Sequence, residues 1–360
     1  MKPSLRLRLS FACAAAFVAG IGAALAQQPP ATLADCHAMA VDGARLACYD
    51  AVTRRTEGRS GAAPAPAPVP APSARMPSDP AASVEIAGDA QTVAASMIDD
   101  AWGFDPSSRR YDIRFYNENY LLFGRWTNDV NNAPFAAVGQ ALRVPPNDIN
   151  STEAKFQFSF SARLWTTDDR RWGVWAAYTQ QNWWQVYNGD LSRPFRETNY
   201  MPELFLSYRP DVDLPGGFRW GLVNAGYNHQ SNGRTDVLSR SWDRLFAEFG
   251  AENGNLGVFA KVWYRIPESA EDDDNPDITD YLGHGAISAL YRWRGHSFSG
   301  WVRGNVGTGK GAVQLAWTSP PFLGPLRGYV QFFSGYGESL IDYNWRQTTI
   351  GAGIALSDGL

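Results

Sequence analysis

The sequence predicts an all-β fold, a transmembrane antiparallel β-barrel of about twelve strands, preceded by a small N-terminal helical module and a flexible linker. Two observations predict the barrel. From residue 119 onward, polar and apolar residues alternate with a period of two in about twelve short segments. Tryptophan and tyrosine residues are frequent at the ends of these segments, as expected for the aromatic girdles of a membrane barrel.

Residues 1–26 have the organisation of a secretory signal peptide. Lys2, Arg6 and Arg8 precede an apolar run that ends in the small-residue sequence Ala-Leu-Ala at positions 24–26. We expect cleavage after Ala26 and export from the cytoplasm. A membrane anchor is the alternative interpretation of the same run.

Residues 27–58 are predicted to form a small module in the periplasm. Their apolar and polar residues follow helical spacing, and they contain Cys36 and Cys48, the two cysteines that remain after cleavage. In an oxidising compartment we expect a disulfide that joins two short helices, with a metal site that includes His37 as the alternative. Residues 59–110 are rich in Ala and Pro and predict a flexible linker and lead-in.

Residues 111–360 are assigned to the barrel. In the clearest strand, Lys155 and Arg163 lie on the polar face, and Phe156 and Phe160 lie on the opposite face, which would meet lipid. The twelve predicted strands are 119–126, 153–165, 172–184, 200–208, 218–231, 241–249, 256–265, 281–292, 296–304, 311–317, 326–334 and 346–356. An even number is the rule for bacterial barrels.

Composition narrows the functional classes. A formal net charge of −4 argues against a nucleic-acid or other polyanion partner. After the signal, no apolar run is long enough for a membrane-spanning helix. A soluble β-sandwich would alternate in the same way, but the export signal and the aromatic girdles favour the membrane barrel.

One predicted hairpin carries candidate catalytic residues. His229 and Ser231 are two apart in a strand, so their side chains leave from the same, apolar face. Asp243 lies on the apolar face of the next strand, and a turn through residues 232–240 would bring the three together. A hydroxyl, an imidazole and an orienting acid are the groups that activate a serine nucleophile. A Ser and a His two apart in a strand are often only a polar pair without a catalytic role. Polar side chains that face lipid are costly, however, so their position here favours a function.

Five sequence blocks, all in one order, resemble the outer-membrane phospholipase A family. They are PFRETNY at 194–200, HQSNGR at 229–234, SRSW at 239–242, DNPDIT at 274–279 and YGESLIDYN at 336–344. The resemblance covers roughly residue 119 to the end. It implies calcium-dependent hydrolysis of phospholipid acyl esters in the outer membrane, of the phospholipase A1, A2 and lysophospholipase type, at a site on the lipid-facing barrel wall.

The resemblance also implies roles for individual residues. Ser231 would be the nucleophile, His229 the general base and Asp243 the residue that orients the imidazole, while the backbone N–H of Gly233 would help to bind the oxyanion. The candidate calcium ligands are Ser192, Arg234, Ser239 and Asp274. The family usually has Asn where this chain has Asp243, so the third member here is a carboxylate, and this bears on the pH dependence of activity.

By the same resemblance, the active form would be a homodimer. The residue that matches Ser192 comes from the partner subunit in the family, and Gln180 matches a glutamine used across the dimer interface. The alternative for Gln180 is a position at headgroup level. For the whole chain, the competing function is a passive pore or structural barrel without catalysis, in which interior residues such as Lys155, Arg163, Asn224, Gln230 and Arg244 would line a channel or bind one another.

Overall fold

The computed structural model describes residues 96–136 and 149–360. The predicted signal peptide, the cysteine module and most of the linker lie outside the described residues, so those assignments stay predictions. Within the described ranges, no helix has the length and apolar character needed to span a membrane.

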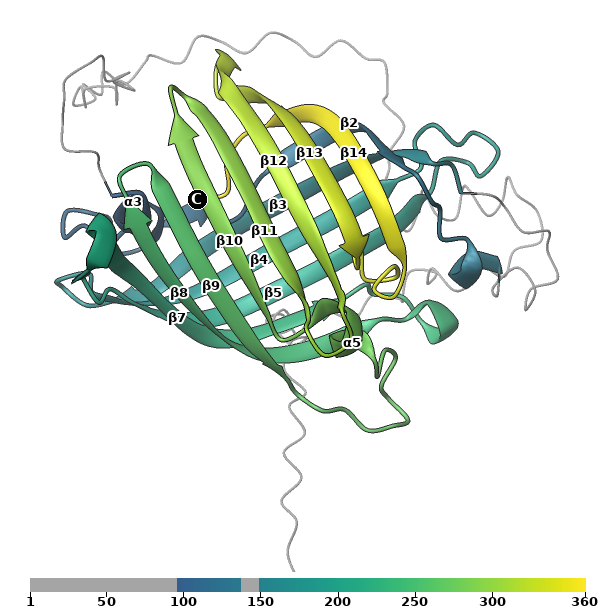
Figure 1. Cartoon of the computed structure of the whole chain (residues 1–360), viewed down its shortest axis with the longest axis horizontal. Coiled ribbons are helices and arrows are strands. Elements are labelled where there is room, and N and C mark those ends of the chain that lie inside the picture. The colour runs from purple at the N-terminus through teal and green to yellow at the C-terminus, as the bar shows by residue number, and fades with distance from the viewer. Residues whose placement is uncertain (1–95, 137–148) are drawn as a thin grey trace, which may run out of the picture. The chain divides into compact units, whose positions relative to one another are not determined.

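Twelve strands form one closed antiparallel barrel (Figure 1). Each strand pairs with its neighbours in sequence, and the ring closes where β2 pairs with β14. Two short strands lie outside this count. β1 (Ile113–Phe115) pairs with β3 and continues the line of β2, and β6 (Val212–Leu214) pairs with β7 and continues the line of β5. The ring consists of β2 (Tyr120–Thr127), β3 (Thr152–Thr166), β4 (Trp172–Trp184), β5 (Phe195–Tyr208), β7 (Phe218–Ser231), β8 (Ser241–Asn253), β9 (Leu256–Arg265), β10 (Gly285–Trp293), β11 (His296–Asn305), β12 (Lys310–Leu323), β13 (Leu326–Tyr336) and β14 (Arg346–Ala355).

The predicted inside and outside faces are confirmed. In β3 the side chain of Lys155 is almost fully buried, whereas Phe158 is 56% exposed on the outer wall. Because the strand has a period of two, the same alternation continues along its length. The outer wall is therefore apolar and the lumen is polar, as a lipid-embedded barrel requires.

Two of the predicted strands have different starts. β5 begins at Phe195 instead of residue 200, because a bulge opposite Trp183 and Trp184 interrupts the alternation and leaves both Arg196 and Glu197 buried. The segment predicted as strand 281–292 begins with a helical turn, α5 (Ile278–Leu282), before β10. A single helical turn is too short to show its period in the sequence.

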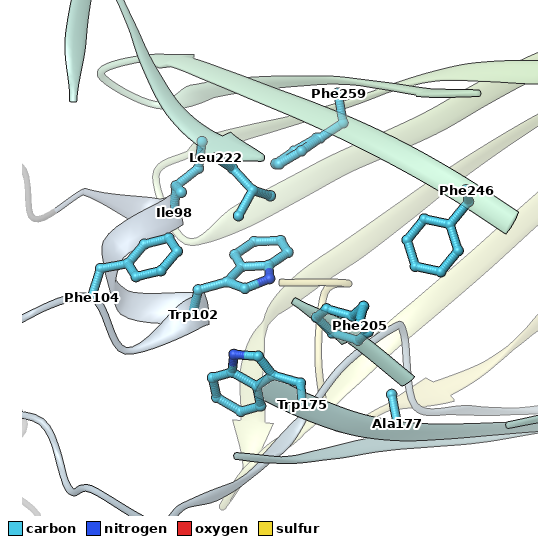
Figure 2. Close-up of a cluster of buried hydrophobic side chains, with 9 residues drawn as sticks. All are labelled: Ile98, Trp102, Phe104, Trp175, Ala177, Phe205, Leu222, Phe246 and Phe259. Atoms are coloured by element: carbon cyan, nitrogen blue, oxygen red, sulfur yellow. The ribbon is translucent and has the colours of Figure 1, made fainter. Parts of the chain in front are cut away.

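The lumen is filled at one end by the segment that leads into the barrel. Helix α3 (Met97–Trp102) lies within the predicted linker and lead-in, residues 59–110. The helix and the turn after it place Ile98, Trp102 and Phe104 among buried barrel residues (Figure 2). Ile98 N donates to Glu252 at 3.0 Å, which fixes the start of the helix. This part of the lead-in is thus a packed plug. Its barrel partners are Trp175, Ala177, Phe205, Leu222, Phe246 and Phe259.

Toward the other end of β3, the loop after β13 folds against a buried network of charges. Three cations and three carboxylates bind one another there: Arg125 to Glu153 and Glu338, Lys155 to Glu338, and Arg196 to Glu153 and Asp342. Their side chains are at most 5% exposed. The charges balance, so the low-dielectric interior holds no unpaired ion within this network. A cavity of about 370 Å³ lies between the network and α3.

We expect Glu338→Gln to destabilise the barrel by about 3–5 kcal/mol, because the change leaves Arg125 and Lys155 buried without their shared carboxylate. Denaturant unfolding of the protein in lipid vesicles measures this. Phe332→Leu, on the lipid-facing side of β13, is the control and should change the free energy of unfolding by less than about 1 kcal/mol. Equal stability of the parent and Glu338→Gln would contradict the role assigned to the network.

Candidate active site

The β7–β8 hairpin brings the predicted base and orienting residue together. His229 lies directly opposite Asp243 in the strand register, and His229 Nδ1 is 2.7 Å from Asp243 Oδ1. The opposite faces of the two strands point inward, as the burial of Asn228 on β7 and of Phe246 on β8 demonstrates. Both members of the pair are about one-third exposed on the outer wall, so they are accessible from outside the barrel.

Ser231 is the last residue of β7 and lies opposite Ser241. It is on the same face as His229 because the two are two residues apart in a regular strand. The Ser231 hydroxyl makes no hydrogen bond with any of the described residues. The hydrogen bond between His229 and Asp243 is therefore formed. Ser231 makes no hydrogen bond to His229, as is common before substrate binds.

Tyr227 is a site residue that the sequence analysis did not identify. Its hydroxyl donates a hydrogen bond to Asp243 Oδ1 at 2.5 Å, so one carboxylate oxygen receives both the tyrosine and the imidazole. The sequence does contain a signal for it, since Tyr227 precedes His229 by two residues and shares its face. A diagonal cross-strand contact of this kind lies within reach of an aromatic side chain.

The loop after Ser231 is organised by the buried amide of Asn232. Asn232 Oδ1 accepts the backbone N–H of Arg234 at 3.3 Å and of Arg240 at 3.0 Å, while Asn232 Nδ2 donates to Leu238 O at 2.8 Å. Gly233 has a φ of +63°, which a residue with a Cβ rarely adopts. The Asn232 side chain therefore bonds to three residues of the loop, and the loop turns at a glycine.

The predicted calcium ligands are only partly assembled within this chain. The Ser239 hydroxyl donates to Asp274 Oδ2 at 2.5 Å, which joins the loop after β7 to the loop between β9 and α5. Arg234 directs its guanidinium toward Glu197 and the backbone of β5, so only its main-chain carbonyl could serve as a ligand. Ser192 is exposed in the turn between β4 and β5, with no hydrogen bond to either Ser239 or Asp274 within the described ranges.

The oxygen atoms of these predicted ligands are of the kinds that bind a hard cation. Hydroxyl, carboxylate and carbonyl oxygens are the ligands that Ca²⁺ takes. In the part of the chain that the structure describes, no cluster of three or more His, Cys, Asp and Glu side chains is suited to a metal ion. A cation here would therefore be held by few charged side chains and would need main-chain oxygens or further ligands.

Gln180 lies on β4, on the face opposite the buried lumen residue Thr179. It belongs to a short polar row on the barrel wall: it accepts from Tyr178 Oη at 2.9 Å and donates to Asn182 Oδ1 at 2.9 Å. These bonds lower the cost of an amide on a lipid-facing wall.

Comparisons with known proteins agree with this fold. The family model for phospholipase A1 matches residues 102–356. Phospholipase A1 of Klebsiella pneumoniae is 42% identical over 248 residues, which cover 68% of this chain and 82% of the relative. Phospholipase A1 of Escherichia coli K12 is 40% identical over 280 residues, which cover 77% of this chain and 92% of the relative.

Two solved structures are similar to the described barrel. The outer membrane phospholipase A from Escherichia coli has a TM-score of 0.62 and 40% identity, and the match covers 68% of this chain and 98% of that chain. The outer membrane phospholipase of Salmonella typhi, solved as a dimer with bound calcium, has a TM-score of 0.65 and 38% identity, with coverage of 74% and 99%. This chain therefore belongs to the phospholipase A1 family and is an enzyme of the outer membrane.

Proposed function

We propose that this chain hydrolyses the acyl esters of phospholipids with Ser231 as nucleophile, His229 as base and Asp243 as orienting residue, in a calcium-dependent reaction that dimerisation activates. The observation that carries the proposal is the hydrogen bond between His229 and Asp243 on the outer wall, two residues from Ser231. A buried lumen would keep acyl chains away, whereas the outer wall admits them from the membrane.

In this mechanism the Ser231 hydroxyl attacks the ester carbonyl and His229 accepts its proton through Nε2. His229 then delivers the proton to the leaving alcohol, which departs as a lysophospholipid, and water releases the fatty acid from Ser231 in a second, equivalent step. Asp243 accepts a hydrogen bond from Nδ1–H and so fixes the tautomer in which Nε2 is free to act as a base.

The developing oxyanion needs donors aimed at it. We assign this role to the backbone N–H of Gly233, which follows Ser231 by two residues in a tight loop. The positive φ of Gly233 and the Tyr200 ring, only 3.0 Å from where a Cβ would stand, explain why glycine suits this position. An added side chain would strain the backbone and push against the ring.

Calcium binding is assigned to Ser239, Asp274 and the carbonyl of Arg234, with Ser192 supplied by a second subunit. The close contact between Ser239 and Asp274 supports the first two. A bound calcium ion would supply positive charge that polarises a water molecule next to the oxyanion. The calcium-bound dimer of the Salmonella typhi relative supports both the ion and the assembly.

The contacts inside the lumen argue against the passive-pore alternative, although Gln230 and Arg244 line the cavity between the charge network and α3. Lys155 binds Glu338 and Gln331, and Arg163 binds the carbonyl of Gly103 at the plug. Arg244 is hydrogen-bonded to Asn228 and Gln230. Lys155, Arg163 and Arg244 are thus bound to their neighbours or to the plug.

The first test compares the parent enzyme with Ser231→Ala and Asp243→Asn in phospholipid hydrolysis, with calcium and with a chelator. We expect Ser231→Ala to lose activity by on the order of 10⁴-fold or more, because the nucleophile is gone. Asp243→Asn should keep activity within about tenfold, since the amide oxygen can still accept a hydrogen bond from Nδ1–H, though as a weaker, neutral acceptor. Full activity of Ser231→Ala would refute the mechanism.

A second test concerns the calcium ligands. Asp274→Asn should raise the calcium concentration for half-maximal activity by about tenfold or more, because a neutral oxygen replaces the one carboxylate among the assigned ligands. Asp272→Asn is the matched control, since Asp272 lies in the same loop but binds Ser269. An equal calcium shift in the two variants would indicate a general effect of the acidic loop and not a ligand.

The third test concerns dimerisation. Gln180→Leu should weaken calcium-dependent dimerisation by about tenfold and lower activity in parallel, because an interface amide in lipid contributes roughly 1–2 kcal/mol. Sedimentation of the full chain in detergent with calcium measures the dimer fraction. Ile287→Ala, on the outer wall of β10, is the control and should leave both unchanged. Unaltered dimerisation of Gln180→Leu would remove Gln180 from the interface.

A further inference from the structure

We propose that Tyr227 is a positioning residue of the active site, whose hydroxyl holds the Asp243 carboxylate in place for His229. This inference rests on the proposed function of Asp243. It concerns a contact that the sequence resemblance does not assign. The hydroxyl of Tyr227 donates to Asp243 Oδ1 at 2.5 Å, the same oxygen that lies 2.7 Å from His229 Nδ1.

The environment of Asp243 makes a second donor important. The carboxylate is on the lipid-facing side of β8, where Leu245 of the same face is 52% exposed. A carboxylate in such surroundings is costly unless hydrogen bonds replace the water it has lost. Within the described residues, no donor binds Asp243 Oδ2, so Oδ1 receives the side-chain hydrogen bonds that the carboxylate has.

The positions of the donors explain why Tyr227 would orient as well as solvate the carboxylate. Tyr227 and His229 are on one face of β7, and Asp243 faces His229 from β8. With the imidazole alone, the carboxylate could rotate about its Cβ–Cγ bond and keep one contact. A second donor on the same oxygen restricts that rotation, so Oδ1 stays directed at the imidazole.

The charge of the Asp243 side chain should determine how much the hydrogen bond from Tyr227 contributes. A hydrogen bond to an ionised acceptor is roughly twice as strong as one to a neutral acceptor. The tyrosine hydroxyl is therefore worth more beside the Asp243 carboxylate than beside the asparagine usual in the family. Tyr227 would thus stabilise a carboxylate at a position where the family usually has an amide.

The test is a double-mutant cycle on the full-length enzyme with saturating calcium in mixed micelles, in which kcat and KM are measured separately. The variants are Tyr227→Phe, Asp243→Asn and the double variant. We expect Tyr227→Phe to lower kcat by about tenfold with KM unchanged, and to lower it by no more than about threefold in the Asp243→Asn background. A merely structural tyrosine would cost the same in both backgrounds.

Two controls separate the possible failures. Tyr291→Phe removes a hydroxyl from a comparably exposed tyrosine on the outer wall of β10 and should leave kcat at the parent level. Ser231→Ala reports on the proposed function itself. Suppose that Ser231→Ala is inactive. If Tyr227→Phe then has the kcat of the parent, or lowers kcat equally in the parent and Asp243→Asn backgrounds, the role of Tyr227 is refuted and the mechanism stands. If Ser231→Ala is active, the proposed mechanism fails as well.

Discussion

Closure of the sheet is the constraint on which the rest of this structure depends. A strand in lipid has no water for its backbone N–H and C=O groups, so every strand must have a partner on both sides. The ring achieves this where β2 pairs with β14. Once the ring is closed, each side chain has only two environments, lipid or lumen. A polar group placed outside must be satisfied by its neighbours on the wall.

The outer wall meets that demand in the region of the proposed site. Asp243 Oδ1 binds both the Tyr227 hydroxyl and His229 Nδ1, and Gln180 binds the polar residues on either side of it along β4. Most of these polar side chains therefore find partners on an otherwise apolar surface, while the Ser231 hydroxyl has no bonding partner among the described residues. Such an arrangement lets the reactive groups contact acyl chains without crossing any barrier inside the barrel.

The filled lumen supports the site from behind. Glu197 on β5 accepts the backbone N–H of Ile341 at 3.1 Å, and through its other oxygen it pairs with Arg234 at 3.4 Å. Asn232 reaches the same carboxylate. One buried glutamate thus connects the loop that folds into the lumen with the loop that carries Gly233. This explains why blocks far apart in the sequence, at 194–200, 229–234 and 336–344, belong to one physical unit.

The sequence by itself determined the strands, their two faces and the candidate pair His229 and Asp243. These depend on local periodicity and on the register of one hairpin, which short-range patterns specify. The sequence also indicated the family through its five blocks. Only the tertiary structure decided how the lumen is filled, that Arg196 and Glu197 both turn inward at a bulge, and that α3 is a plug in what composition alone assigned to a linker and lead-in.

The contacts of Tyr227 with Asp243 and of Ser239 with Asp274 were likewise decided by the fold. Alternation assigns a residue to a face but does not say which neighbour on that face it touches. Ser239 and Asp274 are 35 residues apart and lie in loops, where no period exists. Their meeting depends on the packing of complete elements against one another, and that information is distributed over the whole chain.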